Sequence, residues 1–452
     1  MRAPEPGERP VGRPSLAIAS APAPEFTDSL VLAGAVSPGT AAPGDLQALV
    51  AQTLERNPGL RAAWLEYEAA LQRIPQVTAL GDPEIQLMGM VNENDIGRGP
   101  RRFEIGLMQR FPWFDVLSLQ GQVAFHEALE KQAQYLTQVL DTVRQVQGLW
   151  WELAFQAARR EIAREEQEIL GGIAEIASST AATGTGPLAD IVGAETEEAQ
   201  IEEELINVEQ RVATLTAEIN ELRDVPPGTS VGEPSLSDAS LALVDADVEA
   251  LLASAELMRP EVTEIRHRIE RQLRERSLAR RRGYPQFMVG VEDAFIGSRD
   301  ESMPEDENFE VVLGATIPLW RSAYRAGVAE SQRNLDASHA MLRETSNRVA
   351  QEVQSAHFAR QEALDLMDLY AGVLIPQAET RLEFAQSAFS TGESSLVELL
   401  DAERVLVRLR LAHEQARRDY LLALADLERA VGAALAGPST APLHPGVIAG
   451  AQ

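Results

Sequence analysis

One long helical pattern ends and another begins in Thr391-Gly392-Glu393-Ser394-Ser395-Leu396-Val397-Glu398-Leu399-Leu400-Asp401-Ala402-Glu403. Gly392 can take the left-handed conformation that ends a helix, because it has no Cβ atom to clash with the backbone. The two serines that follow are good N-cap residues. Glu398 and Asp401 then place carboxylates in the first turns of the next helix, where the helix dipole favours negative charge. The stretch therefore predicts the tight reversal of a large helical hairpin.

A second copy of this reversal lies about two hundred residues earlier, at Gly184-Thr185-Gly186-Pro187. In both copies an acidic residue follows the first glycine by six positions, so Asp190 in the first copy corresponds to Glu398 in the second. In both copies an Ala-Glu pair begins ten positions after that glycine, at Ala194 and at Ala402. Two helical hairpins with matched tips predict a duplicated architecture.

The rest of the chain supports the duplication. The dipeptides Asn57-Pro58 and Arg259-Pro260 match at an offset of 202 residues, and so do Pro83 and Pro285. The Phe-Glu-Ile segment at 103–105 and the Phe-Glu-Val segment at 309–311 match at an offset of 206. We expect the four extra residues in an acidic loop at 298–308, because loops tolerate insertions.

Each half contains one pair of segments in which apolar and polar residues alternate, the period of a β-strand. Each pair predicts a β-hairpin with strands of roughly ten residues, which is the length a tilted strand needs to cross a membrane. The same alternation also occurs in half-exposed hairpins of soluble proteins. The apolar positions that we expect on these strands are Ile85, Leu87, Phe103, Ile105, Val289, Val291, Phe309 and Val311.

Helical patterns fill most of the remaining chain. Short helices are predicted at 45–54 and 59–80, followed by a very long helix at 117–179 and a return helix at 187–223. At 1.5 Å per residue, the long helix is a rod on the order of 100 Å. The second half repeats this with a long helix at 323–389, in which Pro376 predicts a kink, and a final helix at 398–431. We expect a mainly α-helical fold with a small β part.

Composition limits what the chain can bind. Its formal net charge of −29 argues against nucleic acid, since a phosphate backbone needs a basic surface. It contains no cysteine, which excludes disulfides and thiolate metal sites. We expect residues 1–44 and 433–452, rich in Pro and Ala, to be disordered, with repeats at 45–223 and 238–432 joined by a linker at 224–237. Residues 15–21 end in an A-x-A-like site, but this apolar run is shorter than that of a normal signal peptide.

No catalytic motif and no cofactor motif emerges from the sequence. The six histidines show no pair at the helical spacing of metal ligands, and neither a phosphate-binding glycine loop nor a nucleophile elbow is present. Met88 and Met90 are better explained as packing residues than as a metal site. We therefore expect no enzyme activity, no bound metal and no cofactor.

Taken together and in order, these features resemble the TolC-like outer-membrane efflux factors of Gram-negative bacteria. The resemblance covers about residues 45–432 and rests on the paired tips, the Asn57-Pro58 break, the internal duplication, and the Phe-Glu-x-x-Leu strands that lead to Pro112 and Pro318. It implies a homotrimer with a twelve-stranded β-barrel in the outer membrane above a long periplasmic α-barrel. Within the family, the segment Phe111-Pro112-Trp113-Phe114 is most similar to the heavy-metal efflux branch.

The resemblance also assigns roles to particular residues. Glu398 and Asp401 correspond to carboxylates that narrow the periplasmic pore entrance, where rings of carboxylates favour cations. Their alternative role is to satisfy the charge of a helix N-terminus. Ser394 stands where some relatives carry a basic residue that pairs with the first-tip acid, so a gate locked by that ion pair is not expected. The tips that dock on a periplasmic adaptor correspond to Gly184, Asp190, Ala194, Gly392, Leu396 and Ala402.

The function implied is that of a passive outer-membrane conduit that works with a periplasmic adaptor and an inner-membrane pump, and exports small molecules or metal ions. Two alternatives remain open at this point: the outer-membrane channel of a type I protein secretion system, and a soluble coiled-coil scaffold. A scaffold would explain the helices but gives no reason for two matched hairpins of ten-residue strands.

Overall fold

The computed structural model describes residues 44–89, 101–182, 188–236, 247–296, 306–391 and 393–435. The chain divides into two compact units, and each unit contains segments from both halves of the sequence. The first unit comprises Met1–Asn57, Val139–Ser254 and Val353–Gln452, and the second comprises Pro58–Gln138 and Ala255–Glu352.

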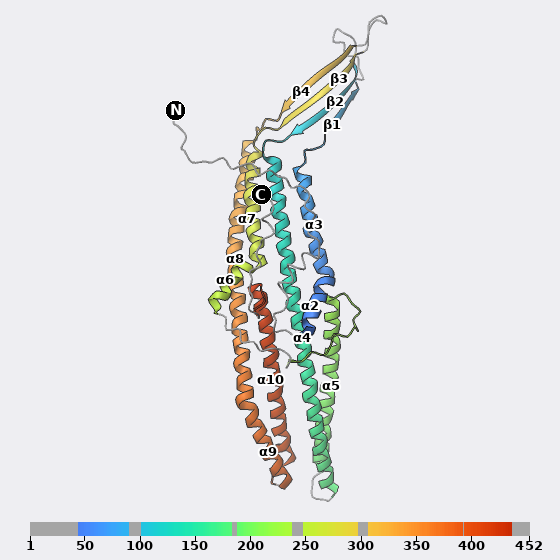
Figure 1. The fold of residues 1–452 in the computed structure, drawn as a ribbon, viewed down its shortest axis with the longest axis vertical. Helices are drawn as coiled ribbons and strands as arrows, with labels where there is room; N and C mark the ends of the chain where they lie inside the picture. The colour runs from blue at the N-terminus through green and yellow to red at the C-terminus, as the bar shows by residue number, and fades with distance from the viewer. Residues whose placement is uncertain are drawn as a thin grey trace. The chain divides into compact units, whose positions relative to one another are not determined.

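The element order follows the predicted duplication (Figure 1). In the first half, two helices precede two strands, a very long helix and a return helix, and the second half repeats this order. The helices are α2 (Gly44–Arg56), α3 (Pro58–Thr78), α4 (Val116–Ala182), α5 (Leu188–Leu222), α6 (Val248–Met258), α7 (Pro260–Arg281), α8 (Arg321–Leu369), α9 (Ile375–Thr391) and α10 (Leu396–Val431). The strands are β1 (Glu84–Gly89), β2 (Arg101–Phe111), β3 (Phe287–Ile296) and β4 (Asp306–Ala315).

The predicted long helix is confirmed, since α4 contains 67 residues. The kink expected at Pro376 takes a specific form. A five-residue π-helical segment, Tyr370–Leu374, separates α8 from α9 directly before the proline. Proline has no N–H to donate and its ring clashes with the carbonyl one turn earlier, so the wider π-turn accommodates it.

The two X-Pro breaks are held by different contacts. In the first unit, Asn57 lies between α2 and α3, and its side-chain amide donates to the carbonyl of Leu222 at the end of α5 (2.8 Å). In the second unit, Arg259 is only 1% exposed and its guanidinium binds both Glu261 and Glu352 at 2.8 Å. A buried arginine needs such carboxylate partners to offset the loss of hydration.

In the first unit, α10 packs antiparallel to α4 through a stripe of buried side chains. Its residues Ala402, Leu406, Ala416, Tyr420 and Leu427 are all at most 5% exposed. Ion pairs flank this seam, since Arg144 binds Asp426 at 2.5 Å, Arg429 binds Asp141 at 2.8 Å and Arg418 binds Glu152 at 3.1 Å. In Figure 1, α9 and α10 lie side by side as a hairpin, as predicted from the Gly392 stretch.

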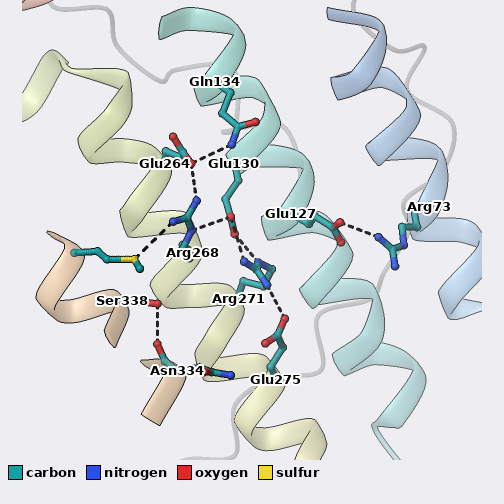
Figure 2. Close-up of polar contacts among 11 residues, drawn as sticks. Arg73, Glu127, Glu130, Gln134, Glu264, Arg268, Arg271, Glu275, Asn334 and Ser338 are labelled. Carbon is teal, nitrogen blue, oxygen red and sulfur yellow. Dashed lines mark hydrogen bonds and ion pairs between the residues drawn. The ribbon is translucent and has the colours of Figure 1, made fainter. Parts of the chain in front are cut away.

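In the second unit, α3, α4 and α7 are joined by an aromatic contact and a polar network. Trp64 is 2% exposed and meets Tyr67 and Tyr135 edge to face at 5.2 and 5.4 Å. Figure 2 shows the polar network centred on Glu130, which is 6% exposed. Its carboxylate accepts from Arg271 at 2.6 Å and from Arg268 at 3.4 Å, two arginines on α7.

None of the helices described has an apolar stretch long enough to cross a membrane.

Candidate functional site

The four strands form one antiparallel sheet in the order β1-β2-β3-β4 (Figure 1). Strands β2 and β3 pair across the two halves of the sequence, with Phe111 opposite Phe287 and Leu107 opposite Val291. The two predicted hairpins are therefore confirmed as strand pairs and joined into one sheet. One detail of the prediction is wrong: β4 begins at Asp306, so residues 306–308 belong to the strand and not to the preceding loop.

One face of this sheet is apolar and exposed. Opposite residues in the register share a face, so Leu87 pairs with Ile105, and Val291 pairs with Leu107 and Val311. All eight apolar strand positions predicted from the sequence lie on this face. Their exposed fractions run from 37% at Val291 to 69% at Ile85 and Phe309, and Leu107 and Leu313 extend the same surface. The isolated chain thus presents a broad apolar surface to its surroundings.

The opposite face is polar, and its side chains are closely packed. It carries Glu84, Gln86, Glu104, Arg110, Glu292 and Glu310, interleaved with glycine and methionine. At Gly290 an added Cβ would lie 2.9 Å from Cγ of Met108, and at Gly314 it would lie 3.0 Å from Cε of Met288. Each of these large side chains fills the space above a neighbouring glycine. Alternation of small and large residues is typical of the inward-facing positions of small β-barrels.

Both edges of the sheet are open in the described part of the chain. Among the strands that the structure describes, β1 pairs only with β2, and β4 pairs only with β3. An edge strand presents a row of free N–H and C=O groups that can pair with another strand. The sheet can therefore be extended at both ends by further strands.

Aromatic residues gather where the strands join the helices. The Trp113 ring stacks on Tyr284 at 5.0 Å and on Phe287 at 5.7 Å, and thus links the end of β2 to the start of β3. Asp115 follows with a positive φ of 66° and accepts from Arg281 at 3.4 Å. The apolar side chains of Phe114, Ile317, Leu319 and Trp320 are each at least 71% exposed here. Exposed aromatics in such a band are typical of a membrane–water interface.

The second tip is built as the sequence predicts at its N-cap. Ser395 caps α10, and its hydroxyl accepts from the backbone N–H of Glu398 at 3.4 Å. Ser394 donates its hydroxyl proton to the Glu398 carboxylate at 2.5 Å. Asp401 accepts from Arg381 of α9 at 2.5 Å, although both side chains are more than half exposed. Glu398 and Asp401 are thus exposed carboxylates on α10, and each has a partner within the hairpin.

The remaining tip residues divide into two groups. Ala194, Leu396 and Ala402 are at most 3% exposed, so their side chains support the tips from within and do not themselves present a surface. Asp190 lies in α5, but the structure does not describe its side chain, and Gly184 and Gly392 lie outside the described residues. Exposed apolar side chains near the tips are instead Val192, Phe384 and Val397, at 61%, 70% and 72%.

The structure also brings together residues that the sequence did not connect. Glu403 on α10 is 2% exposed. Burial, followed by the charges of Glu166 on α4 and Glu197 on α5, raises its pKa to about 7. In the other unit, the rings of His126 and His267 lie 5.9 Å apart, and burial lowers the pKa of both. Among the described residues, no group of three or more His, Asp or Glu side chains is arranged to hold a metal ion. Both groups bring together residues that are far apart in the sequence, so no short-range sequence pattern predicts them.

The family model for the outer membrane efflux protein matches residues 49–222 and 251–433, which is most of the chain. The chain belongs to the outer membrane efflux protein family.

Solved structures of outer-membrane channels have the same fold as this efflux protein. The outer-membrane channel OprN is 16% identical, with a TM-score of 0.75 over 87% of this chain and 91% of its own. The outer membrane protein VceC from Vibrio cholerae is 17% identical, with a TM-score of 0.72 over 86% and 96%. The open state of the MtrE outer membrane channel from Neisseria gonorrhoeae is 16% identical, with a TM-score of 0.70 over 86% and 89%. A comparison with curated proteins gives no significant match.

Proposed function

We propose that this efflux protein is the outer-membrane channel of a tripartite efflux system, a passive conduit that carries small molecules or metal ions from the periplasm to the outside without a catalytic step. The observation that carries the proposal is the sheet with one exposed apolar face, one polar face and two open edges. A membrane excludes unpaired backbone groups, so the sheet needs further strands at both edges before lipid can surround it.

Three copies of the chain satisfy this requirement. Four strands from each copy give twelve, which lies within the range of membrane barrels. The exposed apolar face would then meet lipid, and the polar face would line the channel. The helices supply a second argument for self-association, since the side chains Phe358, Leu369, Val373 and Phe384 are 44–70% exposed. Phe358 and Leu369 are eleven residues apart on α8, a spacing that places them on the same side of that helix.

The tips would meet the other components of the assembly. The exposed apolar residues Val192 and Val397 lie beside the helix reversals, where a periplasmic adaptor attached to an inner-membrane pump would bind. Glu398 and Asp401 would form two rings of carboxylates in the trimer and attract cations to the pore entrance. Arg381 offsets part of the Asp401 charge, so Glu398 would contribute more of this attraction.

The decisive test is reconstitution of the full chain. The protein is extracted from outer membranes, its mass is measured by native mass spectrometry, and its conductance is recorded in planar bilayers. We expect a trimer that forms open pores, with conductance that rises with salt. A monomer or dimer in the soluble fraction would contradict the channel and favour the coiled-coil scaffold.

A second measurement separates efflux from protein secretion. Deletion of the gene is compared with deletion of the pump encoded nearest to it. Equal loss of resistance to small toxic compounds or metal ions, restored by the intact gene, supports the efflux role. Loss of a secreted protein with unchanged resistance would instead assign the chain to a type I secretion system.

A further inference from the structure

Glu403 is an acidic residue placed inside a hydrophobic core. It lies one turn from Leu399, Leu400 and Leu406 on α10, and it is 2% exposed. These leucines belong to a cluster in which all four helices of the two hairpins take part, with members Ala163, Leu170, Ile173, Ile201, Ala378, Leu382, Leu396, Leu399, Leu400, Ala402 and Leu406. One carboxyl oxygen of Glu403 is buried and has no hydrogen-bond partner within the structure described. An ionised carboxylate in such a place loses its hydration without compensation.

The charged groups around Glu403 are mainly of the same sign. Glu166 faces it from α4 and Glu197 faces it from α5. Arg404, the next residue on α10, gives its guanidinium to Glu197 through both oxygens, with Nε at 3.1 Å. The other nearby acids also have partners of their own, since Arg159 binds Glu204 of α5, and Arg381 of α9 binds Asp401. The described contacts thus leave Glu403 without a cation.

A proton removes this conflict. Burial, followed by the charges of Glu166 and Glu197, raises the pKa of Glu403 to about 7. Burial also raises the pKa of Glu166, together with Glu197 and Glu204. A carboxyl whose pKa is raised on folding stabilises the packed state fully below its ordinary pKa. That stabilisation is lost as the pH rises through about 7.

We propose that Glu403 is a proton-controlled contact between the α4–α5 hairpin and the α9–α10 hairpin. With a proton on its carboxyl group, α10 stays packed against α4 and α5. When the proton leaves to water, a buried carboxylate remains beside two others, and the packing near the tips loosens. The contact lies within the first turns of α10, directly after the second tip, where a small change in packing would move that tip.

The sequence repeat supplies a matched reference position. Glu195 occupies the place in the first tip that Glu403 occupies in the second, in the second residue of the Ala-Glu pair. Glu195 is exposed, whereas Glu403 is buried. Of these two matched positions, only Glu403 is placed to form the contact, and Glu195→Gln changes the same charge by the same chemistry without altering the core.

The packing claim is tested by hydrogen exchange on the full chain in detergent or nanodiscs, at pH 6 and pH 8.5. Glu403→Gln keeps the shape of the side chain and imitates its protonated form. At pH 8.5 we expect peptides within 396–412 to exchange about tenfold faster in the natural protein than in Glu403→Gln, since ionisation is then more than one pH unit past the midpoint. At pH 6 the two should agree. Glu195→Gln should behave like the natural protein at both values.

Equal exchange in the natural protein and Glu403→Gln at both pH values would overturn the proposal. A control for folding is the melting temperature at pH 6, which should be unchanged in Glu403→Gln. The consequence for gating rests on the proposed channel function, so bilayer conductance is recorded separately. A pH-dependent current that Glu403→Gln abolishes supports a gate. Absence of current at any pH contradicts the channel, while the exchange result still decides the contact.

Discussion

The Arg381 guanidinium on α9 binds the Asp401 carboxylate on α10, with Nη2 to Oδ2 at 2.5 Å, close to the reversal that joins the two helices. Asp401 is therefore engaged within its own hairpin, whereas Glu398 accepts only a serine hydroxyl among the contacts described. An exposed ion pair contributes little to stability, about 0–1 kcal/mol. The ion pair between Arg381 and Asp401 therefore matters more for the charge at the tip than for the stability of the fold.

Replacement of Arg381 should strengthen cation binding at the tip. In Arg381→Gln the Asp401 carboxylate loses its partner, so the ring of carboxylates proposed at the pore entrance gains effective negative charge. We expect block of single-channel conductance by multivalent cations at lower concentration, by several-fold, and a melting temperature within a few degrees of the natural protein. Arg333→Gln is the matched control, because it removes an exposed arginine from another ion pair on α8.

The carboxylates themselves are tested by the double substitution Glu398→Ala and Asp401→Ala. If they form the constriction, the block by multivalent cations should weaken by about tenfold or more, because both proposed rings lose their charge. Block that stays unchanged would show that these residues only serve the N-terminus of α10. The double substitution Asp365→Ala and Asp368→Ala, at two exposed acidic residues on α8, provides a control of equal charge change.

The two faces of the sheet make opposite predictions for a new charge. Val291→Arg places a guanidinium on the exposed apolar face, where a charge in contact with lipid costs about 2–4 kcal/mol near the middle of the bilayer. We expect strongly reduced amounts of trimer in the outer membrane, measured by unheated gel electrophoresis. Glu310→Arg lies on the opposite face of the neighbouring strand and should assemble normally while changing ion selectivity. Equal assembly of both variants would contradict the assignment of the faces.

Much of the fold could be predicted because its signals are local. Alternation of apolar residues such as Ile105 and Leu107 is confirmed as one face of the sheet, and the Ser395 N-cap forms as expected. The sequence also predicts the kink at Pro376. It does not predict the π-helical form of that kink, which depends on how α8 accommodates the proline. These features depend on only a few neighbouring residues, so the amino-acid sequence is sufficient to predict them.

The parts of the site that could not be predicted join distant helices. Glu403 is buried because it turns toward α4 and α5, and Asp401, two positions earlier, turns toward α9. In the sequence both are acids in the first turns of a helix. The matched residue Glu195 is exposed, so even the internal repeat does not predict the burial of Glu403. Such differences come from the packing of two hairpins, which no single repeat contains.

Gly290 is required by the side chain opposite it. A Cβ atom at this position would lie 2.9 Å from Cγ of Met108 and 3.2 Å from the carbonyl oxygen of Leu107. We expect Gly290→Ala to destabilise the protein by roughly 1–3 kcal/mol through overpacking. The melting temperature of the protein in detergent measures this. Gly89→Ala, where an added Cβ meets nothing within 4 Å, should have a much smaller effect.

The contact with Met108 can be separated from the contact with the backbone. The double variant Gly290→Ala with Met108→Ala removes the first clash and leaves the second. We expect this double variant to recover part of the melting temperature. The control is Gly290→Ala combined with the unrelated substitution Met341→Ala, which should show no recovery. Absence of any recovery would assign the glycine requirement to the Leu107 carbonyl alone.

Glu130 holds α4 to α7 in the second unit, as Figure 2 shows. The pKa of Arg271 is raised, because its hydrogen bonds to Glu130 and Glu275 outweigh the lowering effect of burial. In Glu130→Gln the carboxylate that joins α4 to both arginines is lost, and Arg268 and Arg271 keep only Glu264 and Glu275, one turn away on α7, as partners. Loss of one partner from a buried ion pair costs roughly 3–5 kcal/mol, so a large fall in melting temperature is expected.

The matched control for this prediction lies on the same helix. Glu127→Gln breaks the exposed ion pair with Arg73 of α3, which is 2.7 Å long, and should cost about 0–1 kcal/mol. Thermal unfolding is followed by circular dichroism in detergent at pH 7 for both variants. Similar melting temperatures in the two would mean that Glu264 and Glu275, together with water, satisfy Arg268 and Arg271 once the Glu130 carboxylate is gone. A large difference between them would establish Glu130 as the polar anchor between α4 and α7.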